Sequence, residues 1–260
     1  MIGGLDSVMN SYFKYSVTNP KNVEAISKVF DYTSSVKSTQ SMLESYKANN
    51  SKVRQLSKES ADFLTGYTKG MNELNQTAGK LTNGGVDKLL FDREGKVTED
   101  TVKNTVSAVR DMVDSYNSNL KTLNDNADRG PGVTNQMARM VDDPAPKAGM
   151  DMVGVSVNKD GTLALDEEAL TKALNDETPG QRELFRDIIG GSTGIAAGVQ
   201  KDARAGLRQS AQSLIGNDLA EMQGIRQNDP IREFAQSLKG GGAYALNNNA
   251  AMGILMNMTV

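Results

Sequence analysis

A stripe of residues spaced alternately three and four positions apart constrains the fold of this chain more than any other feature. The stripe is formed by Val29, Tyr32, Val36, Thr39, Leu43, Tyr46, Asn50, Val53, Ser57, Ser60, Leu64, Tyr67, Met71, Leu74, Ala78 and Leu81. A period of about 3.5 residues keeps one helix face turned toward a partner helix and favours a left-handed supercoil. An ordinary amphipathic helix of a bundle explains the spacing equally well. Both interpretations predict one long helix, which the glycines at 84 and 85 bring to an end.

The cleanest helical periodicity lies between Thr98 and about residue 126. Its apolar positions are Val102, Val106, Val109, Val113, Tyr116, Leu120 and Leu123. Burial of each such side chain contributes about 1.5 to 3 kcal/mol, so this helix is expected to pack along its whole length. An antiparallel or three-helix arrangement with the first helix follows.

A β-hairpin is predicted at residues 153–165. Two short apolar runs flank the polar turn Asn158-Lys-Asp-Gly161, whose residue types tolerate left-handed backbone conformations. Asp166 then opens a helix that extends to about Leu174. Residues 89–97 repeat this order in outline, which predicts either a second strand-turn-strand unit or a tight turn.

Further helices are expected at 133–141, from Pro179 to Phe185, from Ile195 onward, around Leu219 to Ile225, and from Pro230 to Leu238. The sequence thus predicts a mainly α protein. Its fold would be a bundle of long antiparallel helices with coiled-coil-like packing, an inserted hairpin and a short C-terminal helical segment. We divide it into an N-terminal segment (1–22), a helical stalk domain (23–216), and a C-terminal helical segment with an apolar tail (217–260).

The composition argues against an enzyme. The chain has neither Cys nor His, so thiolate chemistry, the commonest general base and the commonest transition-metal ligand are all missing. Its 32 acidic and 29 basic residues are expected to form a solvated surface. We therefore expect no catalytic residues, no cofactor and no bound metal.

Net charge and hydropathy restrict the classes of partner that the sequence predicts. A net charge of -3 and the absence of a basic block argue against nucleic acid as a partner. No run of about 18 apolar residues predicts membrane insertion, and the first residues do not have the pattern of a cleaved secretory signal. A soluble protein is expected, either cytoplasmic or exported without a cleaved signal.

Two motifs have competing interpretations. Residues 156–167 partly match a calcium-binding loop, but Ser156 stands where the first acidic ligand belongs, and a hairpin turn explains the other residues. The glycine-rich segment Gly190-Gly-Ser-Thr-Gly194 could hold an anion, but no Lys follows where a phosphate loop needs one. A helix break is the favoured interpretation there.

Two groups of residues are predicted to bind a partner. One is the apolar C-terminal tail, which can dock on its own chain or on another protein; its residues are Met252, Ile254, Leu255, Met256, Met258 and Val260. The other lies on the long N-terminal helix and consists of Leu43, Tyr46, Val53, Leu64 and Tyr67.

Residues 105–216 resemble the flagellar filament cap protein of the hook-associated family. The resemblance rests on Val113, Tyr116 and Asn117 in the second long helix. It also rests on the hairpin pattern of Gly154, Val155, Gly161, Leu163, Asp166 and Glu167. Unlike in that family, no large β-rich domain fits between the helical segments of this chain.

The resemblance implies a secreted structural subunit, cap-like or tip-like, of a bacterial flagellum or related cell-surface assembly. Its partners would be copies of itself or flagellin-like subunits. It would leave the cell through the flagellar export channel, and an export chaperone would be a further partner. The alternative is an intracellular helical adaptor or export chaperone, located in the cytoplasm, that binds a partner helix.

Overall fold

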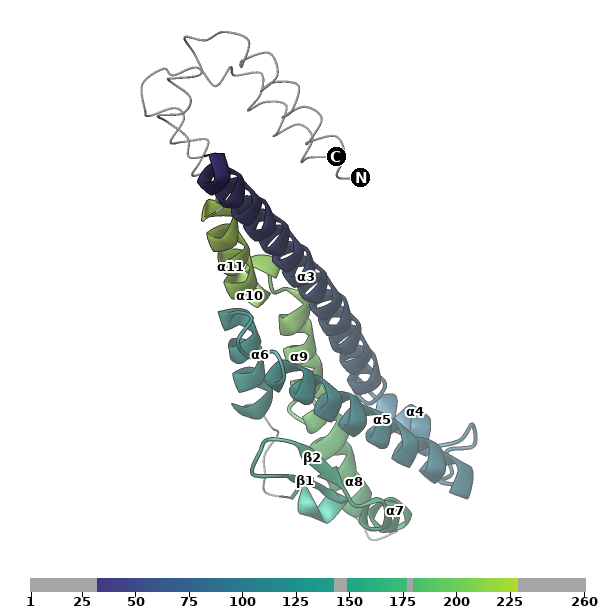
Figure 1. The fold of residues 1–260 in the computed structure, drawn as a ribbon. Coiled ribbons are helices and arrows are strands. Elements are labelled where there is room, and N and C mark those ends of the chain that lie inside the picture. Colours follow the sequence, from purple (N-terminus) through teal and green to yellow (C-terminus); the bar gives the residue numbers. More distant parts are fainter. Residues whose placement is uncertain (1–31, 143–148, 177–179, 229–260) are drawn as a thin grey trace, which may run out of the picture. The chain divides into compact units, whose positions relative to one another are not determined.

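The structure is a computed structural model that describes residues 32–142, 149–176 and 180–228. It is mainly α-helical with one two-stranded antiparallel sheet among these residues, as the sequence predicts (Figure 1). Residues Leu56–Glu221 form one compact unit, which we call the main unit. The remaining residues, Met1–Gln55 and Met222–Val260, form a second unit, of which 32–55 and 222–228 are described.

The predicted long helix is α3, which spans Tyr32–Gly79. Within the main unit its buried face follows the predicted spacing from Tyr67 onward, through Met71, Leu74 and Ala78. One turn earlier the buried residue is Phe63, while Leu64 is only half-buried. The next predicted position, Ser60, is again buried, so the departure from the predicted stripe at Phe63 is local.

The predicted antiparallel packing of α3 is observed with α5 (Glu99–Asn124). Asn119 of α5 donates to the carbonyl oxygen of Gly70 at 3.0 Å. Toward the other end of the pair, Lys80 lies 4.0 Å from Asp111. Residue numbers therefore rise along one helix as they fall along the other.

Helix α9 (Ile195–Leu207) also runs antiparallel to α3. Gln200 donates to the carbonyl oxygen of Asn75 at 3.3 Å. Gly206 lies against Met71 and Tyr67, so close that an added Cβ would come within 2.8 Å of the Met71 sulfur. The main unit thus contains the three-helix arrangement expected from the sequence.

All seven apolar residues predicted for the second long helix are buried in α5. Thr98 is its N-cap, and its hydroxyl and that of Thr101 each accept a backbone N–H of the other residue. This reciprocal cap satisfies two backbone donors that a helix start leaves free. It explains why the helix begins where the sequence predicts.

The expectation of strands in residues 89–97 is wrong, and the tight-turn alternative is confirmed. Helix α4 (Gly85–Leu90) buries Val86 and Leu90, which are spaced like one face of a helix. A turn follows in which the Asp92 carboxylate accepts the backbone N–H groups of Glu94 and Lys96. A short apolar run does not distinguish strand from helix, and tertiary packing decides here.

The predicted hairpin is confirmed. Strands β1 (Val155–Val157) and β2 (Leu163–Leu165) pair antiparallel with Ser156 opposite Ala164. Val153, expected in the first strand, instead ends the short 3-10 turn Asp151–Val153. Helix α7 (Glu167–Asn175) follows the hairpin, and both β2 and α7 contact α5.

The remaining described elements are short helices. Helix α6 is Pro131–Asp142, α8 is Gln181–Phe185, the π-helical turn η2 is Arg186–Gly190, α10 is Ala211–Leu214 and α11 is Gly216–Gln227. The predicted helix Pro230–Leu238 and the predicted boundary at 22/23 lie outside the described residues. The predicted boundary at 216/217 falls at the start of α11. None of the described helices is both long and apolar enough to span a membrane.

Candidate functional site

The residues predicted to bind a partner lie in different environments. Tyr67 is 2% exposed and belongs to the core of the main unit, and half-buried Leu64 packs against that core. In the part of α3 outside the main unit, Leu43 and Tyr46 are half-buried and Val53 is buried. The six tail residues lie outside the described residues. A role in partner binding stays a prediction for all of them.

The two sequence patterns that carry the family resemblance touch each other in the structure. Asn117 of α5 donates its side-chain N–H to the carbonyl oxygen of Leu163 at 2.8 Å, and its side-chain oxygen accepts the Leu163 N–H at 2.8 Å. The neighbouring residue Thr162 uses its carbonyl to pair with Asn158 across the hairpin, so the groups of Leu163 point to the outer edge. The amide of Asn117 therefore occupies the place of a neighbouring strand.

Tyr116, one residue earlier, contacts the turn of the same hairpin. Its buried hydroxyl donates to the carbonyl oxygen of Met140 and lies 3.1 Å from that of Gly161. Burial, with a smaller contribution from the negative charge of Asp202, raises the pKa of Tyr116 to about 12. The hydroxyl therefore stays protonated and remains a donor at physiological pH.

The backbone conformation at position 154, which belongs to the same pattern, requires a glycine. Gly154 has a φ of 72°, a conformation that residues with a Cβ rarely adopt. An added Cβ would also lie 2.5 Å from the carbonyl oxygen of Asp166 and 2.7 Å from the backbone nitrogen of Leu170. The glycine lets the start of the hairpin pass directly against the start of α7.

Asp166 and Glu167 attach α7 to this arrangement. Asp166 is the N-cap of α7, and its carboxylate accepts the N–H of Ala169 at 2.9 Å. Glu167 forms a two-point ion pair with Arg110 of α5, in which the Arg110 Nε to Glu167 Oε1 distance is 2.5 Å. Hydrogen bonding to Arg110 and the charge of that residue lower the pKa of Glu167. The residues on which the family resemblance rests thus make contacts that hold the hairpin and α7 against α5.

The polar side chains of the hairpin turn form hydrogen bonds with one another and with the backbone of the turn. The Asp160 carboxylate accepts the N–H of Thr162 at 3.0 Å and its hydroxyl at 2.7 Å, and these bonds lower the pKa of Asp160. Asn158 donates to the same hydroxyl at 2.9 Å. In residues 32–142, 149–176 and 180–228, no three acidic side chains gather closely enough to hold a metal ion. Backbone geometry accounts for this turn.

The glycine-rich segment at 190–194 lies between η2 and α9. An added Cβ on Gly194 would come within 2.8 to 2.9 Å of the carbonyl oxygens of Asp187, Ile188 and Ile189. Carbonyl oxygens repel anions, so this surrounding supports a helix break rather than a phosphate site. Gly190 similarly allows the turn to approach the carbonyl oxygen of Leu81.

A buried polar cluster at one end of the main unit was not predicted from the sequence. Ser60 of α3 donates to the Asp218 carboxylate at 2.6 Å, and Arg129 donates to the same oxygen at 2.6 Å. The Arg129 guanidinium also lies 5.4 Å from the centre of the Phe63 ring, within the range of a cation–π interaction. The cluster joins α3, the segment after α5, and α11. In the sequence its members are more than 60 residues apart, which leaves no local signal.

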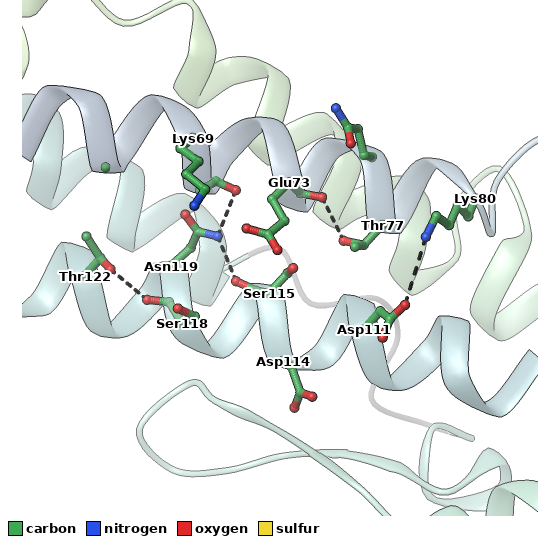
Figure 2. A pocket seen from close by; sticks show the side chains of 13 residues that line it. Lys69, Glu73, Thr77, Lys80, Asp111, Asp114, Ser115, Ser118, Asn119 and Thr122 are labelled. Carbon is green, nitrogen blue, oxygen red and sulfur yellow. Dashed lines mark hydrogen bonds and ion pairs between the residues drawn. The ribbon is translucent and has the colours of Figure 1, made fainter.

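A polar groove of about 660 Å³ runs between α3 and α5 (Figure 2). All the residues that line it come from these two helices. On α3 they are Gly66, Lys69, Gly70, Glu73, Gln76, Thr77 and Lys80, and on α5 Asp111, Asp114, Ser115, Ser118, Asn119 and Thr122. The groove is therefore an open two-helix surface rather than an enclosed ligand cavity.

At the floor of the groove, Asn119 of α5 lies against Gly70 of α3. The Asn119 side chain there donates to the carbonyl oxygens of Gly70 and Ser115, at 3.0 and 2.8 Å. An added Cβ on Gly70 would lie 2.3 Å from the Asn119 side-chain oxygen. At Gly66 an added Cβ would meet nothing within 4 Å. Small and polar side chains thus leave room for another molecule above the floor.

Comparisons of the chain with models of known protein families, with curated proteins and with solved structures found no match.

Proposed function

We propose that this chain is a non-enzymatic structural subunit of a flagellum-related extracellular assembly, cap-like or tip-like, that acts through self-association and helix packing. The observation that carries the proposal is the contact between Asn117 and Leu163. It joins the two sequence patterns on which the resemblance to the filament cap family rests. Asn117 belongs to the first pattern and Leu163 to the second, and the two hydrogen bonds between them are partly buried.

The side-chain contacts within the main unit support the same proposal. The contacts of Tyr116, Asn117, Gly154, Asp166 and Glu167 hold helices and hairpin together. Contacts that serve the fold are expected of a structural subunit. Export through a flagellar channel and location at the cell surface belong to this proposal, as does association with copies of the chain or with flagellin-like subunits.

The assembly part of the proposal can be tested on the purified full chain. Multi-angle light scattering over a wide concentration range, followed by negative-stain electron microscopy, should show a defined oligomer or a filament-like particle. A monomer at every concentration would contradict the proposal and favour the helical adaptor or export chaperone. That alternative would then predict a stable complex with a partner helix instead of self-association.

A further inference from the structure

The two edges of the groove between α3 and α5 carry opposite net charge. The α3 edge has two lysines and one glutamate, Lys69, Lys80 and Glu73, which gives 2 − 1 = +1. The α5 edge has two aspartates, Asp111 and Asp114, which gives −2. A surface whose two halves are oppositely charged is complementary to itself when it is rotated so that each half meets the other.

We propose that this groove is the contact surface for a second copy of the chain, docked face to face about a two-fold axis that runs parallel to α3 and α5. Such an axis places the α3 edge of each copy on the α5 edge of the other. Rotation about this axis leaves the position of each residue along the helix direction unchanged. Lys80 and Asp111, which lie at the same height 4.0 Å apart within one chain, therefore also face each other between copies.

The other face-to-face arrangement is disfavoured by charge. A two-fold axis that crosses the helices places α3 on α3 and α5 on α5. The aspartate edge at Asp111 and Asp114 would then face its own copy, and like charges placed opposite each other destabilise an interface. Self-complementarity therefore selects the axis parallel to the helices.

The floor of the groove permits the close approach that such docking requires. Gly66, Gly70 and Ser115 place little side-chain volume between the two edges. The hydroxyl of Thr77 is already bonded to the carbonyl oxygen of Glu73 in its own helix at 3.0 Å, so its burial leaves no donor unpaired. An interface of this polarity retains water and is expected to be weak, with a dissociation constant of micromolar order or above, about 10⁻⁶ M or more.

This inference rests on the proposed function, which requires self-association, and it names one surface through which copies of the subunit associate. Its test is a charge exchange in the full chain, measured by sedimentation velocity. Lys80→Glu alone and Asp111→Lys alone should each weaken self-association by about tenfold or more, because both copies lose their opposite-charge contacts. An equimolar mixture of the two variants should associate at least as tightly as the original chain, since both contacts then pair opposite charges.

Lys58→Glu is the matched control, because this exposed lysine lies on α3 outside the groove. It should leave association unchanged, and circular dichroism should show all variants folded. As the chain has no cysteine, a mixture of Lys80→Cys and Asp111→Cys chains offers a second measurement. Under mild oxidation it should form more disulfide-linked dimer than either variant alone.

Association that persists in both single variants, or that the mixture does not restore, would overturn the groove inference and leave the proposed structural function standing. A mixture of cysteine variants without excess cross-linked dimer would also overturn it. A chain that stays monomeric at all concentrations would overturn both the groove inference and the proposed function.

Discussion

The side chain of Asn117 bonds to both backbone groups of Leu163, donating to its carbonyl oxygen and accepting its N–H, each at 2.8 Å. A single helical residue thereby satisfies the outward-facing backbone groups of Leu163 in β2. Because a two-stranded hairpin is marginally stable alone, this bond to α5 contributes to holding it in place. The contact also places α7, which starts directly after β2, against the same helix.

Replacement of Asn117 by Ala should lower the free energy of unfolding by about 1 to 3 kcal/mol, since two partly buried hydrogen bonds are lost. Chemical denaturation measures this change, and hydrogen exchange should show faster exchange of the Leu163 N–H. The control is Asn104→Ala, at an exposed position of the same helix. It should change stability by less than about 0.5 kcal/mol. Equal effects of the two substitutions would show that the Asn117 contact contributes nothing specific.

Gly154→Ala and Gly66→Ala should have opposite effects on stability. At Gly154 the left-handed backbone and the carbonyl oxygen of Asp166 leave no room for a Cβ, so a loss of more than about 1 kcal/mol is expected. At Gly66, inside α3, a Cβ meets nothing, and Ala should stabilise the helix by about 0.5 to 1 kcal/mol. Thermal unfolding of the two variants gives the comparison. A neutral Gly154→Ala would contradict the observed backbone.

Tyr116 should make stability depend on alkaline pH. Its pKa rises from 10.0 in the unfolded chain to about 12 in the folded protein. Its contribution is therefore fully present below pH 10 and is lost as the pH rises toward 12. Tyr116→Phe should lower stability at neutral pH by about 1 to 2 kcal/mol, and its difference from the original chain should shrink above pH 10. A difference that stays constant up to pH 11.5 or so would contradict the pKa shift.

The ion pair of Arg110 and Glu167 should contribute at neutral pH and fade in acid. The pKa of Glu167 lies below its ordinary value of 4.5, so the stabilisation is present above pH 4.5 and disappears as the pH falls through the lowered pKa. A double-mutant cycle of Arg110→Ala and Glu167→Ala measures the coupling. Both side chains are 46% exposed, so the coupling should be small and should decrease with added salt. A coupling that grows below pH 3 or so would refute this account.

Asp218→Ala should be the most damaging of these substitutions. It leaves the Arg129 guanidinium, whose side chain is 19% exposed, without the carboxylate that it contacts at 2.6 Å. Removal of one partner from such a pair typically costs about 3 to 5 kcal/mol when it is fully buried, so about 2 to 4 kcal/mol is expected here. The control Asp125→Ala removes a carboxylate that is 50% exposed and paired with Lys121. Similar unfolding midpoints for the two variants would contradict a stabilising role of the Asp218 cluster.

The sequence predicted those features that depend on local spacing. The seven apolar positions of α5 are all buried, and their alternating three- and four-residue spacing, which places them along one face of the helix, was visible in the sequence. The hairpin was recognisable because its Asn, Asp and Gly residues match the backbone demands of the turn. The tight turn at Asp92–Gly95 was recognisable for the same reason, because its Asp and Gly residues suit a turn.

Features that depend on distant packing were not predicted. Residues 85–90 form a helix because Val86 and Leu90 are buried, a preference that a six-residue segment does not reveal by itself. The Ser60, Arg129 and Asp218 cluster joins segments far apart in the chain. The groove requires knowing that α3 and α5 are neighbours, since neither helix alone carries both charged edges.

The most direct test of the proposed function is to express the protein in a flagellated bacterium and follow it into the culture medium, with the flagellar export apparatus intact and with it inactivated. The account predicts that full-length protein appears in the medium or on the cell surface only when export is intact. A cytoplasmic marker should stay inside the cells in both cases. Protein that remains in the cytoplasm of cells with intact export would contradict the account.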